Sequence, residues 1–375
     1  MYILIGADLV PTSSNAELFR AGDADGLLGA ELCDIMQTAN YRIFNLEVPL
    51  VDTTDLICKR GPHLIASTDT VGAYKAMGVD LLTLANNHIL DQGVQGMNST
   101  LTVLTENKIP YLGVGNNQQE AAKPYIFDFS GKKIGVYACA EHEFSIVNEK
   151  APGANPFDPL ETPDHISDLK KQCDHVIVLY HGGKEHYRYP SPDLQKVCRK
   201  LVEKGADLVL CQHSHCIGCE EKYLEGTIVY GQGNFLFDYS NSEYWQTSLL
   251  VRIEEDFNIN YIPLRKQGNS VRVATGEDAE FILNGFAKRS EEIKQEGFIQ
   301  AEYDKFAETM INGYLFALSG KRKSFFFRAI NKLSGYRYVK WYMKRRYKKE
   351  SLLALRNFIE CEANRELILR GLLNE

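Results

Sequence analysis

The sequence has no apolar run long enough to span a bilayer. Its first apolar stretch, residues 2–5, is shorter than the core of a secretion signal and runs directly into Gly6 and Asp8. We therefore interpret this stretch as the first strand of the fold. On this ground we expect a cytoplasmic protein.

Cysteine does not occur in the even, regularly spaced pattern of a disulfide framework. The chain of 375 residues has nine cysteines, and free thiols are the expectation for such a protein. Three of them, Cys211, Cys216 and Cys219, lie next to His213 and His215, so a structural zinc site is an alternative. A second paired cysteine cluster is missing, and buried thiols are favoured instead.

The composition is that of a soluble globular protein, with 44% hydrophobic and 24% charged residues. Strand-like and helix-like segments alternate up to about residue 267, which predicts an α/β fold. A helix after Ser191 has a complete set of boundary signals, with Pro192 in its first turn and Gly205 at its end. We predict a main domain at residues 1–267 and a helical extension at residues 268–375.

Several predicted strands end abruptly in residue types that bind metals. These are Asp8, Glu47, Asn87 with His88, His181, and His213 with His215. The carboxyl ends of parallel strands face one edge of a sheet, where ligand sites collect. One histidine at a strand end is more often a hydrogen-bonded residue than a ligand. The same ending on five segments favours a shared site.

Five motifs carry a family resemblance: NLE (45–47), ANNHILDQG (85–93), HGGKEHYRYP (181–190), GADLVLCQHSH (205–215) and VYGQGNF (229–235). In this order they resemble the CapA family of capsule and poly-γ-glutamate biosynthesis proteins, a branch of the calcineurin-like metallophosphatase superfamily. The resemblance covers roughly residues 2–250. It implies a four-layer α/β/β/α sandwich with a binuclear metal site at the sheet edge.

The resemblance also implies a role for each motif residue. One metal would be bound by Asp8, Glu47 and His215, and the other by Glu47, Asn87, His181 and His213. His88 would protonate the leaving group, and Asp91, three residues later, could orient its ring. These ligand types suit one or two divalent ions of Mn, Fe, Zn or Co.

Two positions depart from the superfamily pattern. Val10 stands where many metallophosphatases have a histidine ligand, so the first of these metal positions loses a donor. Glu47 stands where most relatives have a bridging aspartate, an exchange that CapA proteins share. The pair His213 and His215 is expected to project two imidazoles from one side of an extended segment.

Three further residues are expected near the substrate. Asn45 belongs to the first motif, Glu185 follows the HGG turn, and Asn234 follows a tight turn of glycines. We expect them to line a substrate pocket.

The resemblance implies a metal-dependent hydrolase. The expected chemistry is phosphomonoester or phosphodiester hydrolysis by a metal-activated hydroxide, with His88 as general acid. The alternative is an accessory protein of capsule, polysaccharide or poly-γ-glutamate biosynthesis that handles or hydrolyses an anionic polymer.

A basic aromatic segment at residues 321–349 differs from the rest of the chain. It contains 12 Lys or Arg, no Asp or Glu and 8 aromatic residues, whereas the whole chain has a formal charge of −7. The segment could dock on the acidic main domain, or bind an anionic membrane surface or polymer; nucleic acid is less favoured. Residues 277–318 are expected to be helical, and residues 350–372 to form one amphipathic helix.

Overall fold

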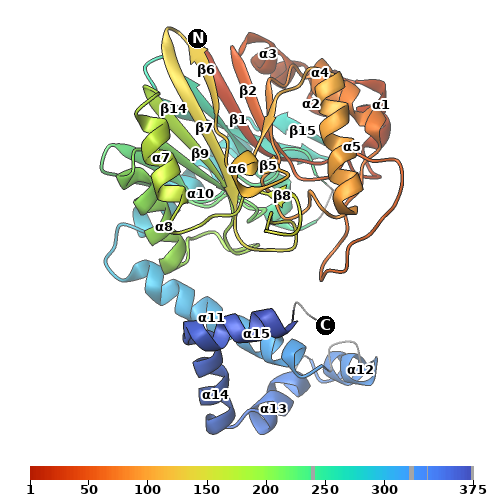
Figure 1. Ribbon diagram of the computed structural model, residues 1–375, viewed down its shortest axis with the longest axis vertical. Coiled ribbons are helices and arrows are strands. Elements are labelled where there is room, and N and C mark those ends of the chain that lie inside the picture. Colours follow the sequence, from red (N-terminus) through yellow and green to blue (C-terminus); the bar gives the residue numbers. More distant parts are fainter. Residues whose placement is uncertain (238–240, 321–324, 336, 373–375) are drawn as a thin grey trace. The chain divides into compact units, whose positions relative to one another are not determined.

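The computed structural model describes residues 1–237, 241–320, 325–335 and 337–372 (Figure 1). The chain divides into two compact units, Met1–Ile299 and Gln300–Glu375. The first unit extends beyond residue 267 because a strand and a helix that follow this position pack on it. The domain boundary that the sequence suggests at residue 267 stays a prediction.

All strands in the described residues belong to the first unit. They are β1 (Tyr2–Leu9), β2 (Tyr41–Leu46), β3 (Leu81–Thr83), β4 (Tyr111–Leu112), β5 (Val114–Gly115), β6 (Tyr125–Phe129), β7 (Lys132–Ala140), β8 (Gly153–Ala154), β9 (His175–His181), β10 (Leu208–Gln212), β11 (Glu220–Tyr223), β12 (Gly226–Val229), β13 (Thr247–Glu254), β14 (Ile259–Gln267) and β15 (Ser270–Val273).

The helices of the first unit lie between these strands and after the last of them. They are α1 (Ala16–Ala21), α2 (Ala24–Leu28), α3 (Ala30–Thr38), the short 3₁₀ helix η1 (Thr68–Thr70), α4 (Val71–Ala76), α5 (Gly93–Glu106), α6 (Gln118–Ala121), α7 (Thr162–Lys170), α8 (Pro192–Glu203), α9 (Glu243–Gln246) and α10 (Gly276–Glu292).

Two large sheets form the centre of the first unit. The first sheet has the strand order β15-β14-β13-β1-β2-β3-β4, and the second has β11-β12-β10-β9-β7-β6. Strands β1 to β4 run parallel to one another, as do β7, β9, β10 and β12. Each sheet therefore collects the carboxyl ends of several strands at one edge.

Three apolar cores separate four layers. One core lies between the sheets and includes Ile5 of β1 and Leu179 of β9. A second core lies between the first sheet and the helices from α1 to α5, and a third lies between the second sheet and α7 and α8. Figure 1 shows these two sets of helices on opposite sides of the strands. The expected α/β/β/α sandwich is confirmed.

Local sequence signals explain two of the elements. The hydroxyl of Ser191 accepts a hydrogen bond from Leu194 N at the start of α8, as its capping position predicts. Ser130 and Gly131 have φ of 52° and 76° in the turn between β6 and β7, which is the geometry of a tight hairpin. The helix start that the sequence predicts at Ser191 is confirmed.

The second unit is helical. Its elements are α11 (Phe298–Leu318, which begins in the first unit), α12 (Phe325–Leu333), α13 (Arg337–Arg346), α14 (Lys349–Glu360) and α15 (Glu362–Leu372). The expectation of one helix over residues 350–372 is wrong, because Cys361 has extended dihedral angles between α14 and α15. Asn364 donates a hydrogen bond to Asn357 across this break. Residues 321–324 and 336 of the basic segment lie outside the described residues.

Within the described ranges, none of the helices combines the length and the apolar character needed to cross a bilayer.

Candidate metal centre

The six predicted metal ligands lie at the carboxyl ends of strands from both sheets, and all six are buried. Asp8 is in β1, Glu47 directly follows β2, Asn87 follows β3, His181 ends β9, and His213 and His215 follow β10. The structure brings the carboxylate and imidazole donors together in two groups that share Glu47, and Oδ1 of Asn87 lies 3.1 Å from His181 in one of them. We call Glu47, Asn87, His181 and His213 the first ligand group, and Asp8, Glu47 and His215 the second ligand group.

The imidazole of His181 is the centre of the first ligand group. Its Nε2 lies 3.1 Å from Oε1 of Glu47, 3.1 Å from Oδ1 of Asn87 and 3.1 Å from Nδ1 of His213. Ligand atoms that neighbour each other in an octahedral shell with bonds of about 2.1 Å are about 3 Å apart. The spacing in this group is therefore compatible with donors around one ion.

The second ligand group is less tightly arranged. Nδ1 of His215 lies 3.5 Å from Oδ2 of Asp8 and 2.8 Å from Oδ1 of Asn234. Val10 is fully buried, and its backbone N–H donates to Leu236 O, so this position belongs to the apolar core. The second group consequently offers three side-chain donor residues, and Oδ1 of Asn234 lies against Nδ1 of His215.

Unsatisfied buried carboxylates test whether these residues fit a cation. Oδ2 of Asp8 and both carboxylate oxygens of Glu47 are buried without a hydrogen-bond partner among the described residues, and only the imidazoles of His215 and His181 lie within ion-pair distance of two of these oxygens, at 3.5 and 3.1 Å. Buried carboxylates are costly unless a cation or an ion pair compensates them. The two groups fit divalent metal ions, and their mixture of imidazole, carboxylate and amide does not distinguish Mn, Fe, Zn and Co.

The pKa shifts show that the buried carboxylates and imidazoles act on one another. Burial opposes the charged form of Asp8, but the neighbouring imidazoles of His215 and His181 outweigh it, and the pKa of Asp8 lies below its ordinary value. Burial also opposes the charged form of His215, yet Asp8 and Glu47 raise its pKa to about 9. The pKa of His213 is well below its ordinary value because of burial and the positive charges of His181 and His215.

Two buried asparagines support the predicted ligands through hydrogen bonds. Nδ2 of Asn45 donates to Oδ1 of Asp8 at 2.8 Å and lies 3.2 Å from Nδ1 of His181, so this fully buried residue contacts both groups. Nδ2 of Asn86 donates to Oδ1 of Asn45 at 3.1 Å, and Oδ1 of Asn86 accepts from the backbone N–H of His88. Groups that orient metal ligands in this way usually contribute to affinity. The sequence indicated no role for Asn86.

The segment from Gln212 to His215 is not extended, and the expectation that it would be is wrong. His213 and His215 have φ of 84° and 53°, in the left-handed region that few residues other than glycine adopt. Such conformations carry strain and cluster at functional sites. This geometry separates the two rings, whose centroids lie 5.9 Å apart, and directs one imidazole to each ligand group.

His88 lies beside Asp91, as the sequence predicts. Nδ1 of His88 lies 2.6 Å from Oδ2 of Asp91, which also accepts from the backbone N–H of Leu64. Lys59 is a residue that sequence reasoning missed. Its side chain is only 2% exposed, pairs with Oδ1 of Asp91, and places Nζ 3.2 Å from Nδ1 of His88.

Two acidic residues after β7 were also missed. Oε2 of Glu143 accepts a hydrogen bond of 2.8 Å from Nδ2 of Asn87, which leaves Oδ1 of Asn87 facing His181. Oε1 of Glu141 lies 3.8 Å from Nε2 of His213, and burial raises the pKa of this carboxyl. The only sequence signal for these two residues was that β7, like the strands that precede the predicted ligands, is followed by polar residues.

The remaining predicted pocket residues occupy different places. Asn234 is buried and holds His215, as described above. Glu185 is exposed in the loop after β9, where its charge acts on His186. Trp245 stacks on His215 with ring centroids 4.8 Å apart and donates to His186 Nε2. A role for Glu185 in a substrate pocket stays a prediction.

The cysteines near the ligand groups are buried thiols that do not belong to either group. Cys211, Cys216 and Cys219 are buried, and burial raises the pKa of the Cys216 thiol to about 11. Sγ of Cys211 lies 3.6 Å from Sγ of Cys198. Within the described part of the chain, the groups that could hold a metal contain no cysteine.

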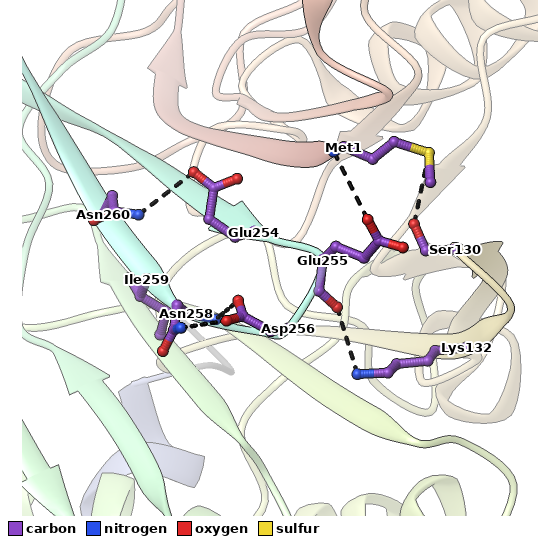
Figure 2. Close-up of a pocket in the computed structure, with 9 residues that line it drawn as sticks. All are labelled: Met1, Ser130, Lys132, Glu254, Glu255, Asp256, Asn258, Ile259 and Asn260. Atoms are coloured by element: carbon purple, nitrogen blue, oxygen red, sulfur yellow. Dashed lines mark hydrogen bonds and ion pairs between the residues drawn. The ribbon is translucent and has the colours of Figure 1, made fainter.

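A pocket elsewhere on the first unit contains none of the predicted site residues. It lies at the amino ends of β1 and β7, away from the ligand groups, and its lining includes Lys132, Glu255 and Asp256 (Figure 2). Lys132 Nζ donates to the backbone oxygen of Glu255 there, at 3.4 Å. We therefore assign the candidate chemistry to the opposite ends of the strands.

Comparisons with known sequences agree with the motifs. The family described as "Bacterial capsule synthesis protein PGA_cap" matches residues 7–239. The capsule biosynthesis protein CapA of Bacillus anthracis is 29% identical over 222 residues, which cover 57% of this chain and 54% of the relative. The PGA biosynthesis protein CapA of Bacillus subtilis strain 168 is 32% identical over 183 residues, which cover 47% of each chain. The chain thus spans about half the length of these curated relatives.

Among solved structures, a putative 5'-nucleotidase from Staphylococcus aureus in complex with alpha-ketoglutarate aligns with a TM-score of 0.44 and 15% identity, covering 76% of this chain and 57% of that chain.

Proposed function

The chain belongs to the bacterial capsule synthesis protein family PGA_cap, and from this premise we propose that it is a metal-dependent hydrolase of phosphomonoesters or phosphodiesters. One observation carries the proposal. Two groups of buried donor atoms share Glu47, and the His88–Asp91 pair directly follows the ligand Asn87 in the chain. With divalent ions bound by these donors, the arrangement would supply both an electrophilic centre and a proton donor for a leaving group.

The first ligand group would hold one ion, and the second would hold the other. Two ions bound in this way supply an activated water as nucleophile and neutralise charge on a phosphoryl group. The protein's contribution is to fix the donors. Asn45 restrains Asp8 and His181, Glu143 restrains Asn87, and the buried position of Glu47 keeps bulk water from its oxygens.

His88 is the proposed general acid. Asp91 lies against Nδ1 of the ring, so the proton for a leaving group would be on Nε2. Asp91 has both oxygens engaged, one with His88 and one with Lys59. Lys59 therefore compensates the buried carboxylate and helps to hold the histidine in one orientation.

The family supports a second candidate function. Relatives of this chain are named as capsule and PGA biosynthesis proteins, and one from Mycobacterium tuberculosis is named as a probable polyglutamine synthesis accessory protein. The same centre could act in handling or hydrolysing such an anionic polymer. Both candidates require a divalent ion, but they differ in the bond that is cleaved.

A substrate comparison separates the two candidates. The purified chain, supplied with Mn²⁺ or Fe²⁺, is assayed on aryl phosphomonoesters and phosphodiesters and, separately, on poly-γ-glutamate by measuring its chain length. Turnover of the phosphoesters with unchanged polymer supports the first candidate. Shortening of the polymer without phosphoester turnover supports the second and overturns the first.

His88→Ala tests the assignment of the general acid. We expect this variant to keep its metal content and to lose about 10²- to 10⁴-fold in turnover of an aryl phosphodiester, because only proton transfer is removed. His165→Ala on α7, which removes an imidazole that contacts Tyr137, is the matched control. Wild-type turnover by His88→Ala would show that the role of His88 is wrong.

A further inference from the structure

Helix α12 exposes a stripe of large apolar side chains. Phe326, Ile330 and Leu333 follow the i, i+4, i+7 spacing of one helix face and are 76%, 42% and 88% exposed. Phe325, next to the stripe, is also exposed. Contiguous apolar side chains on a surface usually mark an interaction site.

The side of α12 next to this stripe is occupied within the second unit. The ring of Phe327 contacts those of Phe316, Tyr338 and Tyr342, with centroids 5.9, 5.7 and 5.0 Å away. Oδ1 of Asn331 accepts from the backbone N–H of Val339, which fixes α12 against α13. The apolar stripe is therefore not the face that joins these helices.

Basic side chains accompany the stripe. Exposed residues of this kind on α12 and α13 are Lys332, Arg337, Lys340, Lys344, Arg345 and Arg346. The sequence has no Asp or Glu between residues 309 and 349. The guanidinium of Arg345 lies 4.6 Å from the ring centroid of Trp341, which is itself half exposed. Apolar, tryptophan and basic side chains in this combination are typical of helices that lie at a membrane surface.

We propose that α12 and α13 form a docking surface for a membrane rich in anionic phospholipid. Charge complementarity indicates an anionic partner, and the exposed Phe326, Ile330 and Leu333 favour lipid over a hydrated polyanion, which offers no apolar layer to receive them. The neighbouring α14 and α15 also expose apolar residues but mix Glu with Arg, so among these four helices the basic side chains without acidic neighbours are those of α12 and α13.

Vesicle sedimentation with the full chain tests this surface. We expect the protein to bind phosphatidylcholine vesicles containing phosphatidylglycerol about tenfold or more tightly than vesicles of phosphatidylcholine alone. Added salt is expected to weaken the binding, because it screens charges beyond about 8 Å at physiological ionic strength. The assay needs neither metal nor substrate, so its result is independent of the proposed hydrolysis.

Two double variants separate the apolar and the basic contributions. Phe326→Ser with Leu333→Ser, and Lys340→Glu with Lys344→Glu, are each expected to weaken binding by about tenfold or more. Matched controls on the first unit are Leu160→Ser with Leu224→Ser, and Lys75→Glu with Lys123→Glu, which change exposed residues of the same kinds. The controls are expected to bind as the unaltered chain does.

Tryptophan fluorescence tests the proposal without a substitution in α12 or α13. The chain has two tryptophans, so Trp245→Phe leaves Trp341 as the only one. We expect the emission of Trp341 to shift to shorter wavelength when phosphatidylglycerol vesicles are added, as the indole leaves water.

Three results would overturn the proposal. The first is equal binding to neutral and anionic vesicles, and the second is no vesicle binding with an unshifted Trp341. The third is a result that assigns the surface to another partner. Such a result is release from vesicles by poly-γ-glutamate or duplex DNA at a charge concentration equal to that of the lipid. Self-association that the same double variants abolish would count in the same way.

Discussion

The two ligand groups share Glu47 but differ in how the protein satisfies their donors. In the first group, three donor atoms lie 3.1 Å from Nε2 of His181. In the second group, His215 is already engaged by Asn234 at 2.8 Å, and Val10 offers no donor. A site with more converging donors binds an ion more tightly, so the comparison predicts one tight and one weaker ion.

Removing the shared carboxylate is expected to have the largest effect. Glu47→Gln keeps the size of the side chain but removes the negative charge that would lie between two cations. We expect loss of both ions and a fall in phosphoester turnover of about 10³-fold or more. Elemental analysis after dialysis measures the metal, and Glu149→Gln, an exposed position, is the control. Retention of two ions by Glu47→Gln would contradict a shared ligand.

Substitutions in one ligand group at a time are expected to have the next largest effect, and they test whether the two groups bind ions with different affinity. Asparagine tolerates a positive φ, so His213→Asn and His215→Asn change the donors with little backbone strain. We expect His213→Asn to weaken the tight ion by about 100-fold or more, and His215→Asn to weaken only the other ion. Competition with a chromophoric chelator resolves the two affinities. Equal losses at the same site would remove the distinction between the groups.

The smallest expected effect concerns the residue that contacts both groups. Asn45→Leu removes the amide between Asp8 and His181, and we expect both ions to weaken by about 10- to 100-fold. Thr83→Val, which removes only a hydroxyl that donates to Asn45, is the matched control and is expected to change little. If Asn45→Leu affects a single ion, the amide supports that group alone.

Sequence reasoning predicted which candidate ligands the structure would bring together, because the positions of these residues depend on topology. In a parallel sheet, the carboxyl ends of the strands lie along one edge. Polar residues that follow apolar runs in the sequence therefore indicate a candidate site at this edge. Asp8 and His181 are separated by most of a domain in sequence, yet Asn45 contacts both.

The missed residues lie where no periodicity exists. Lys59 comes from the irregular loop after β2, and Glu143 from the loop after β7, so neither had a pattern to place it. The left-handed conformations of His213 and His215 were equally hidden, because this backbone region is unusual for histidine. The break at Cys361 was also missed, since the apolar spacing runs through it without glycine or proline.

The position of the centre between the sheets has a mechanical consequence. Glu47 and Asn87 follow strands of the first sheet, whereas His181 and His213 belong to the second. An ion held by these four residues would join the two halves of the sandwich as a removable cross-link. Removing the ion with a chelator would remove a link between the two sheets at this edge, so we expect the sheets to separate there first during unfolding. The same donor residues would then determine both reactivity and the first step of unfolding.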